Sequence, residues 1–220
     1  MPGAWEIQPT VLCAILHTET TTLAWSVGLK NLQLNGRISL LSGMPYDHAR
    51  NEACKQCLIE GWDYLFFLDS DVIPPADAIQ RLIQKGKPII SGLYCRRSSP
   101  HAVPVAIKDG QWLTTLPKNK NNPLVEVHQV GAGCLLIRRN VLEQLPPQRE
   151  GKHWFDWKVD MRGHNIFPDN QCLSEDFTFS QHAIKNGFKV ILDTSVRCKH
   201  VGLAEAGYMS YVPLNPYSAA

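Results

Sequence analysis

Apolar runs of strand length alternate with amphipathic segments of helix length along most of the chain. Strands are predicted over residues 10–16, 37–42, 64–68, 88–94, 125–130, 134–137 and 188–192. Helices, in which apolar residues recur at three- and four-residue spacing, are predicted over 23–32, 47–60, 75–86, 140–144 and 174–186. This alternation is typical of an α/β fold with a mixed, mostly parallel central sheet flanked by helices.

The clearest helix is the one over 174–186. Ser174 stands at its N-cap, acidic residues fill its first turn, and Gly187 follows its end. The pattern weakens between residues 96 and 123, where the polar run 118–122 predicts a surface loop. The tail after His200 has no periodicity, so we expect either a lid over a site or an unstructured terminus.

Composition sets the broad class. A chain of 220 residues with 44% hydrophobic content is expected to form one domain around one core. The net charge of +2 and pI near 8.2 suit an anionic ligand but lack the dense basic stripe of a dedicated nucleic-acid binder. The apolar run 11–16 is too short for a membrane span, and we expect a soluble, cytoplasmic protein.

The seven cysteines are odd in number and scattered, which favours reduced thiols over a disulfide framework. Cys54 and Cys57 form a C-x-x-C pair, but no second pair completes a zinc site. Their spacing matches the core face of the predicted helix over 47–60. We therefore expect them to pack as small hydrophobic residues.

Two carboxylates follow the apolar strand at 64–68. Asp69 and Asp71 are two residues apart on extended chain, so both side chains can face one cation. Ligands of α/β proteins collect beyond the carboxyl ends of the strands, where these acids stand. Hard oxygen ligands suit Mg²⁺ or Mn²⁺, which would in turn hold a diphosphate. A turn or helix-capping role also fits, because D-x-D is a short pattern.

Further candidates for chemistry come late in the chain. Glu175 and Asp176 open a predicted helix, whose N-terminus favours ionised carboxylates, and one of them could act as a general base. Complementing the helix dipole is the alternative. His200 follows the last strand and could complete the coordination of a metal, or be an ordinary core or surface histidine.

In combination these features resemble glycosyltransferases of the GT-A fold, in particular the family 2-like enzymes of bacteria and phages. The likeness rests on the D-x-D after an apolar strand, the Gly-Ala-Gly loop at 131–133, the Glu175-Asp176 pair and His200. It extends from about residue 10 to residue 202. It implies a single Rossmann-like GT-A domain that moves a sugar from a nucleoside-diphosphate sugar to a hydroxyl acceptor. The acceptor could be a glycan, a small molecule or a modified DNA base.

The resemblance also implies roles for individual residues. Asp69 and Asp71 would bind Mn²⁺ or Mg²⁺, with His200 as a further ligand. Asp176 would be the catalytic base, beside Glu175, in a displacement expected to invert the anomeric centre, with retention left open. The residues implied to bind the donor are His17, Thr18, Glu19, Arg50, Asn51, Asp69, Ser70, Tyr94, Arg96, Gly131 and Gly133.

Residues 10–95 would form the nucleotide-binding half, 96–202 the acceptor and catalytic half, and 203–220 the tail. Structural alternatives stand beside several of these roles. Arg50 and the Arg96-Arg97 pair could be solvated charges, and 131–133 could be a β-bulge. The aromatic cluster at 153–157 could line a pocket or pack in the core.

Other function classes fit less well or stay open. A dehalogenase-type phosphotransferase also places D-x-D after an apolar strand, but no late Asp-Asp motif follows here. A nucleotidyltransferase needs an N-terminal Gly-rich loop, and no glycine occurs between Leu16 and Gly28. A noncatalytic nucleotide-sugar or carbohydrate-binding protein remains an alternative. Basic residues that could contact DNA, or simply face solvent, are Lys118, Lys120, Arg96, Arg97, Arg138, Arg139 and Arg149.

Overall fold

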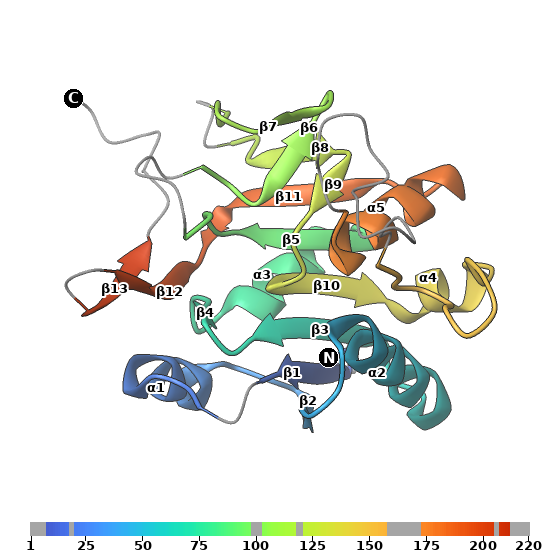
Figure 1. Cartoon of the computed structure of the whole chain (residues 1–220), viewed down its shortest axis with the longest axis horizontal. Coiled ribbons are helices and arrows are strands. Elements are labelled where there is room, and N and C mark those ends of the chain that lie inside the picture. The colour runs from blue at the N-terminus through green and yellow to red at the C-terminus, as the bar shows by residue number, and fades with distance from the viewer. Residues whose placement is uncertain are drawn as a thin grey trace, which may run out of the picture.

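The computed structural model of the chain describes residues 8–17, 20–97, 103–117, 121–157, 173–204 and 207–211, with side chains as far as Val201. A seven-stranded sheet with the order β2-β1-β3-β10-β5-β11-β8 runs through its centre (Figure 1). Its strands are β1 (Val11–Leu16), β2 (Gly36–Leu41), β3 (Tyr64–Asp69), β5 (Ile89–Leu93), β8 (Leu124–Val127), β10 (Cys134–Arg138) and β11 (Val190–Arg197).

The sheet is mixed and mostly parallel, as predicted. Strands β2, β1, β3, β5 and β11 share one direction, while β10 and β8 are antiparallel to their neighbours. The parallel strands β1, β3 and β5 are buried along nearly their whole length, because helices cover both faces of the sheet. Their carboxyl ends therefore meet at one edge of the sheet.

Helices divide between the two faces. The helices are α1 (Leu23–Asn31), α2 (Tyr46–Glu60), α3 (Ala78–Gln84), α4 (Arg139–Gln144) and α5 (Glu175–Lys185). Helices α2, α4 and α5 pack on the face that carries Leu12, Leu65 and Phe67, and α1 and α3 on the face of Cys13 and Phe66. Figure 1 shows α2 in front of the sheet and α3 behind it. Alternate residues of each strand thus enter two separate cores, as the two-residue period of a strand requires.

Two small sheets flank the central one. Strands β13 (Gly207–Tyr211), β12 (Lys199–Ala204) and β4 (Val72–Ile73) form the first, and β7 (Gln111–Trp112), β6 (Ala106–Lys108) and β9 (Gln129–Val130) the second. Of the two alternatives expected for the tail after His200, an unstructured terminus is wrong for its described part, where β12 and β13 form a hairpin, and a lid over a site stays a prediction. Strand β12 pairs with β4, which lies more than 120 residues earlier in the chain. A pairing over such a distance leaves no periodic signal in the sequence of the tail.

The local predictions fare well in this structure. The predicted helices and most predicted strands are found within a few residues of their expected limits, and Gly61 ends α2 at a φ of 77°. Two strands differ: the one predicted over 125–130 is divided between β8 and β9, which belong to different sheets, and the one predicted over 188–192 extends to Arg197 as β11. Cys54 and Cys57 are buried in the core, which confirms the packing interpretation, and burial raises the pKa of the Cys57 thiol to about 12. None of the helices in the described ranges has the length and apolar character that a bilayer crossing requires.

Candidate active site

A cavity of about 310 Å³ opens at the carboxyl ends of β1 and β3. Residues from α2, from the loops after β3 and β5, from α5 and from β12 contribute to its wall. The lining residues are Leu16, Tyr46, Arg50, Asp69, Ser70, Asp71, Tyr94, Arg97, Val105, Trp157, Ser174, Glu175, Asp176 and His200. The acids expected from the D-x-D and from the start of α5 therefore share one cavity with His200.

The turn that carries the two aspartates is held from several sides. The Trp25 indole N–H of α1 donates to the Asp69 carbonyl at 3.0 Å, and the Thr21 hydroxyl donates to the Ser70 carbonyl at 2.9 Å. On the other side, the Asp69 N–H donates to the Gly133 carbonyl at 3.2 Å. These bonds fix where the carboxylates leave the end of β3.

Asp71 and His200 face each other because β4 pairs with β12. The Val201 N–H donates to the Asp71 carbonyl at 2.8 Å, and His200 Nε2 lies 3.4 Å from Asp71 Oδ1. His200 Nδ1 lies 2.7 Å from the Cys95 carbonyl, which can only accept, so Nδ1 carries a proton. This leaves Nε2 to interact with the Asp71 carboxylate, and a cation bound by both atoms would take the place of a proton there.

The donor set here suits a small divalent cation. Two ligand atoms about 2.1 Å from one ion lie roughly 3.0 Å apart at a right angle, so the 3.4 Å between Asp71 and His200 needs only a small closure. The carboxylate oxygen fits Mn²⁺ or Mg²⁺, and the imidazole nitrogen favours Mn²⁺ of the two. Within the described ranges, no group of three or more His, Cys, Asp and Glu side chains surrounds a single point. Ligand oxygens would therefore have to supply most of the coordination.

Arg50 of α2 forms the floor of the cavity. Its Nη2 lies 3.1 Å from Asp69 Oδ1, its Nε lies 3.0 Å from Glu175 Oε1, and only 3% of the side chain is exposed. Burial opposes the charged form, but the carboxylates of Asp69 and Glu175 outweigh it, and the pKa of Arg50 is raised above its ordinary value. Nη1 has no hydrogen-bond partner among the described residues. A fixed positive charge thus lies under the cavity.

The pKa values of the two carboxylates that bond Arg50 are shifted in the same direction. Desolvation is the main cause that raises the pKa of Asp69, while Arg50 opposes the shift. Burial likewise raises the pKa of Glu175, again against Arg50. Glu175 anchors Arg50 in this structure, and the catalytic role predicted for it beside the base stays a prediction.

Asp176 is the less buried acid of the Glu175-Asp176 pair and also lines the cavity. Its Oδ2 accepts from the Ala132 N–H at 3.2 Å, and its Oδ1 accepts from the Phe177 N–H at 2.8 Å and from the Ser174 hydroxyl. Ser174 is the predicted N-cap by position, but its hydroxyl bonds this carboxylate and caps no backbone N–H. Three donors hold the Asp176 carboxylate in one orientation.

Tyr94 explains the glycines of the 131–133 loop. A Cβ at Gly131 would lie 2.1 Å from the Tyr94 hydroxyl oxygen, and one at Gly133 would lie 3.0 Å from the ring. That hydroxyl accepts from the Gly133 N–H at 2.9 Å, and the ring packs edge-on against His200. Gly131 and Gly133 do not line the cavity. In this structure the glycines make room for Tyr94, and the donor-binding role implied for them stays a prediction.

Asn51 and Arg96 make contacts within the protein, and the donor-binding role implied for each stays a prediction. The Asn51 amide donates to the Asp47 and Phe155 carbonyls, and its oxygen accepts from two N–H groups at 154–155, so it fastens that segment to α2. The Arg96 guanidinium lies 4.3 Å from the centre of the Trp112 ring, outside the cavity wall. Its neighbour Arg97 lines the cavity instead.

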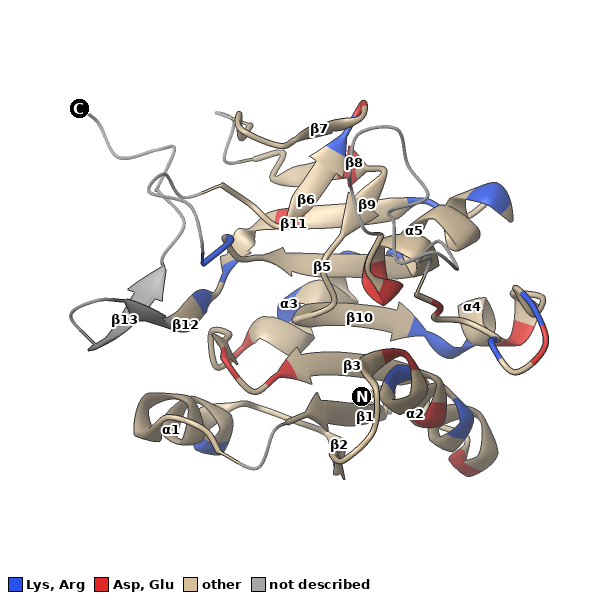
Figure 2. Ribbon diagram, viewed as in Figure 1, with Lys and Arg blue, Asp and Glu red and all other residues tan. Residues whose placement is uncertain are grey.

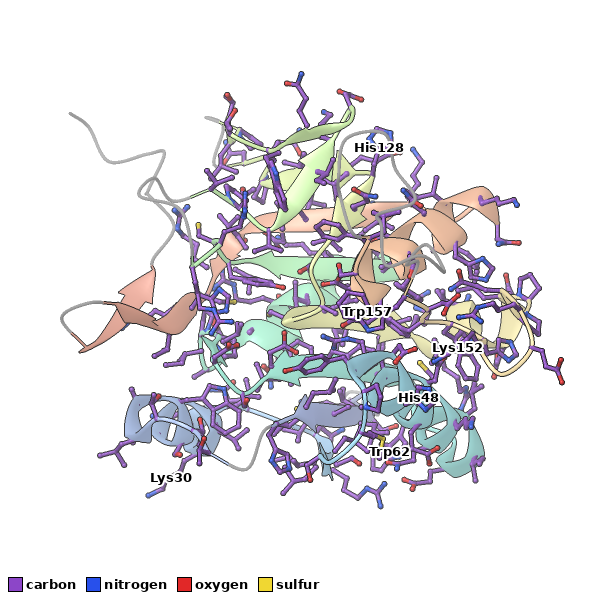
Figure 3. The ribbon with its side chains drawn as sticks, viewed as in Figure 1. Lys30, His48, Trp62, His128, Lys152 and Trp157 are labelled. Atoms are coloured by element: carbon purple, nitrogen blue, oxygen red, sulfur yellow. The ribbon has the colours of Figure 1, made fainter. Side chains whose placement is uncertain are left out.

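The aromatic residues at 153–157 lie in two different environments. Trp154 and Phe155 are buried, and Phe155 stacks on Phe179 with ring centres 4.5 Å apart. Trp157 lines the cavity and lies between α2 and α5 in Figure 3. Lys152, also labelled there, pairs with Asp47 of α2. Packing and cavity lining are therefore both realised, by different members of the cluster.

A second cavity of about 580 Å³ adjoins the first, and Leu16 and Tyr46 line both. It lies beyond the carboxyl ends of β1 and β2, and its other lining residues are His17, Leu41, Gly43, Met44, Pro45 and Ala49. His17 is thus placed beside the acidic cavity, whereas the predicted ligands Thr18 and Glu19 lie outside the described residues. Sequence reasoning missed Tyr46, whose only signal is an aromatic residue directly after the Gly-Met-Pro turn.

Charge is distributed unevenly around this region. Figure 2 shows acidic residues at the turn after β3 and at the first turn of α5, while Lys and Arg are spread over several separate elements. Four acidic side chains converge on the cavity, and Arg50 and Arg97 lie between them. The arrangement suits a cation and a phosphate-bearing ligand together.

Comparison with known proteins supports the fold. No protein-family model matches the sequence, and no curated protein is similar to it. Among solved structures, the crystal structure of A197 from STIV matches this chain with a TM-score of 0.60 and 18% identity, over 94% of this chain and 95% of that one. At that identity the likeness shows a shared α/β fold over nearly the whole length of both chains, and function has to be argued from the site.

Proposed function

We propose that the protein is a metal-dependent glycosyltransferase that moves a sugar from a nucleoside-diphosphate sugar to a hydroxyl acceptor, with inversion. The observation that supports this most is that Asp71, His200 and Asp176 line one cavity at the carboxyl edge of the sheet. A carboxylate–imidazole pair suited to a cation and a separate, oriented carboxylate are the two kinds of group that this transfer needs.

The donor would bind across both cavities. Asp71 and His200 would hold Mn²⁺ or Mg²⁺ together with Asp69, and the cation would neutralise charge on the departing diphosphate. The positive charge of Arg50 under the cavity favours the same polyanion. The adjoining cavity, with Tyr46 and His17 in its wall, would receive the nucleoside.

Asp176 would take the proton from the acceptor hydroxyl. The acceptor oxygen then attacks the anomeric carbon, and the electron pair of the bond between that carbon and the diphosphate oxygen leaves with the diphosphate. The hydrogen bonds from the Ala132 and Phe177 N–H groups hold the carboxylate in place for this step. Arg50 joins Asp69 to Glu175, so it keeps the donor side and the base side of the cavity at a fixed spacing.

The test uses a panel of nucleotide sugars with Mn²⁺, scored by released nucleoside diphosphate and by thermal shift. We expect one donor to stabilise the protein and to be turned over. Asp176→Asn should retain that thermal shift and lose roughly 10²- to 10⁴-fold in rate, as expected for a general base. Asp71→Asn is the matched change at the proposed metal ligand. It should lose turnover and also the part of the thermal shift that depends on Mn²⁺.

The noncatalytic alternative makes a different prediction. A wild-type protein that is stabilised by a nucleotide sugar, yet releases no nucleoside diphosphate with any acceptor class, would be a binding protein. Unchanged turnover in Asp176→Asn would remove this residue as the base. Analysis of the product anomer then decides between inversion and retention.

A further inference from the structure

Arg97 holds the oxygen of Asp71 that faces away from His200. Its Nη1 lies 3.0 Å from Asp71 Oδ2, while Oδ1 faces His200 Nε2 at 3.4 Å. About half of the Arg97 side chain is exposed (52%), and Asp71 is 32% exposed. The carboxylate proposed as the main metal ligand is thus paired with a cation of the protein itself.

This pair competes with a metal ion. A divalent cation between Asp71 and His200 would lie close to the guanidinium, and the two positive charges repel each other. An exposed Arg–Asp pair contributes little to stability, so Arg97 can leave Asp71 at small cost. Arg50 cannot play this part, because it is buried and bonds both Asp69 and Glu175.

We propose that Arg97 occupies Asp71 in the free protein and moves to a phosphate oxygen of the donor when the cation binds. This inference rests on the proposed function and adds a residue to it. The guanidinium suits phosphate, to which it can donate two parallel hydrogen bonds. Metal and donor then bind cooperatively: the metal alone must displace Arg97, whereas the metal with its diphosphate gives Arg97 a new partner.

The first test measures Mn²⁺ binding without nucleotide, by the electron paramagnetic resonance signal of the free ion. Arg97→Ala should bind Mn²⁺ about three- to tenfold more tightly than the wild type, because the competing charge is gone. Arg37→Ala is the matched control. Arg37 is 49% exposed and pairs with Glu60 at 2.7 Å on edge strand β2, so the control removes a similar ion pair and the same charge. It should leave Mn²⁺ affinity unchanged.

The second test adds UDP, GDP or ADP at saturating Mn²⁺ and follows binding by calorimetry. For the nucleotide that the wild type binds, Arg97→Ala should bind it about tenfold more weakly, as expected for loss of one charged hydrogen-bonding group. Arg97→Lys keeps the charge but not the paired donors, so its nucleotide affinity should fall in between. Its affinity for Mn²⁺ alone should remain near that of the wild type.

The two proposals fail in different ways. If Arg97→Ala folds and binds Mn²⁺ no more tightly than the wild type, the competition is overturned while the metal site stands. Nucleotide affinity that is unchanged in Arg97→Ala overturns the transfer of Arg97 to the donor. If the wild type binds no Mn²⁺ with any of the three nucleotides, the proposed metal site is wrong and the inference falls with it.

Discussion

Two arginine–carboxylate pairs lie side by side in the wall of one cavity and differ in nearly every physical respect. Arg50 is buried, bonds Asp69 and Glu175, and joins α2 to the end of β3 and the start of α5. Arg97 is half exposed and bonds only Asp71 in the part of the chain described. The buried pair is suited to holding the site together, and the exposed pair is suited to exchange with a ligand. The same chemistry thus serves architecture in one place and binding in the other.

The largest expected contrast comes from removing each guanidinium in turn. Arg50→Met leaves two partly or fully buried carboxylates without their partner, and we expect a loss of about 3 to 5 kcal/mol in the free energy of unfolding. Arg97→Met should cost about 0.2 to 1 kcal/mol, as for other exposed pairs. Denaturant unfolding of both variants measures the difference. Losses of equal size would show that the two pairs do not differ as their burial suggests.

A smaller loss of stability is expected where Tyr94 packs between the 131–133 loop and His200. Gly131→Ala places a methyl group 2.1 Å from the Tyr94 hydroxyl and 2.7 Å from a Val105 methyl, which forces the ring to move. Such overpacking costs about 1 to 3 kcal/mol. Because the ring packs against His200, Mn²⁺ affinity should weaken with it.

The rescue variant tests the cause of this effect. Adding Tyr94→Phe to Gly131→Ala removes the nearest clashing atom and should restore part of the lost stability. The single variant Tyr94→Phe serves as the reference, since it already lacks the hydroxyl that accepts from Gly133. If the double variant is no more stable than Gly131→Ala alone, the glycine is required for another reason.

The sequence predicted those parts of the site whose signal is local. Asp69 and Asp71 follow an apolar run, and Glu175 and Asp176 open an amphipathic helix, so strand and helix patterns place them at the sheet edge. Their convergence follows from the α/β topology, because the carboxyl ends of parallel strands meet at one edge. The fold class was predictable for the same reason.

What the sequence could not show depends on partners far away along the chain. Arg50 and Glu175 are 125 residues apart, and nothing near either one predicts that the arginine is buried. Nothing near Gly131 predicts that the bulk requiring a glycine there belongs to Tyr94. Nothing near Asn51 predicts that its side chain bonds the loop at 154–155. Residue type alone does not distinguish a ligand contact from a packing contact.

The smallest predicted effect is a pH dependence of stability that differs in sign between two acids. Burial raises the pKa of Glu175 above its ordinary value of 4.5, so the folded protein binds this proton more tightly than the unfolded chain. The corresponding stability is complete below pH 4.5 and is lost as the pH rises through the folded pKa. Glu175→Gln stays neutral, so its melting temperature should fall less than that of the wild type over this range.

The pKa of Asp63, just before β3, is shifted in the opposite direction. Hydrogen bonds from Thr10 lower its pKa below the ordinary 3.8, so its contribution is present above that value and is lost as the pH falls through the folded pKa. Asp63→Asn should therefore reduce the dependence of the melting temperature on pH at the acid end of the range. Glu175→Gln should reduce it above pH 4.5. Thermal unfolding across this pH range measures both slopes. If both substitutions changed the profile in the same direction, then burial on one side and hydrogen bonding on the other would not be the causes of the two shifts.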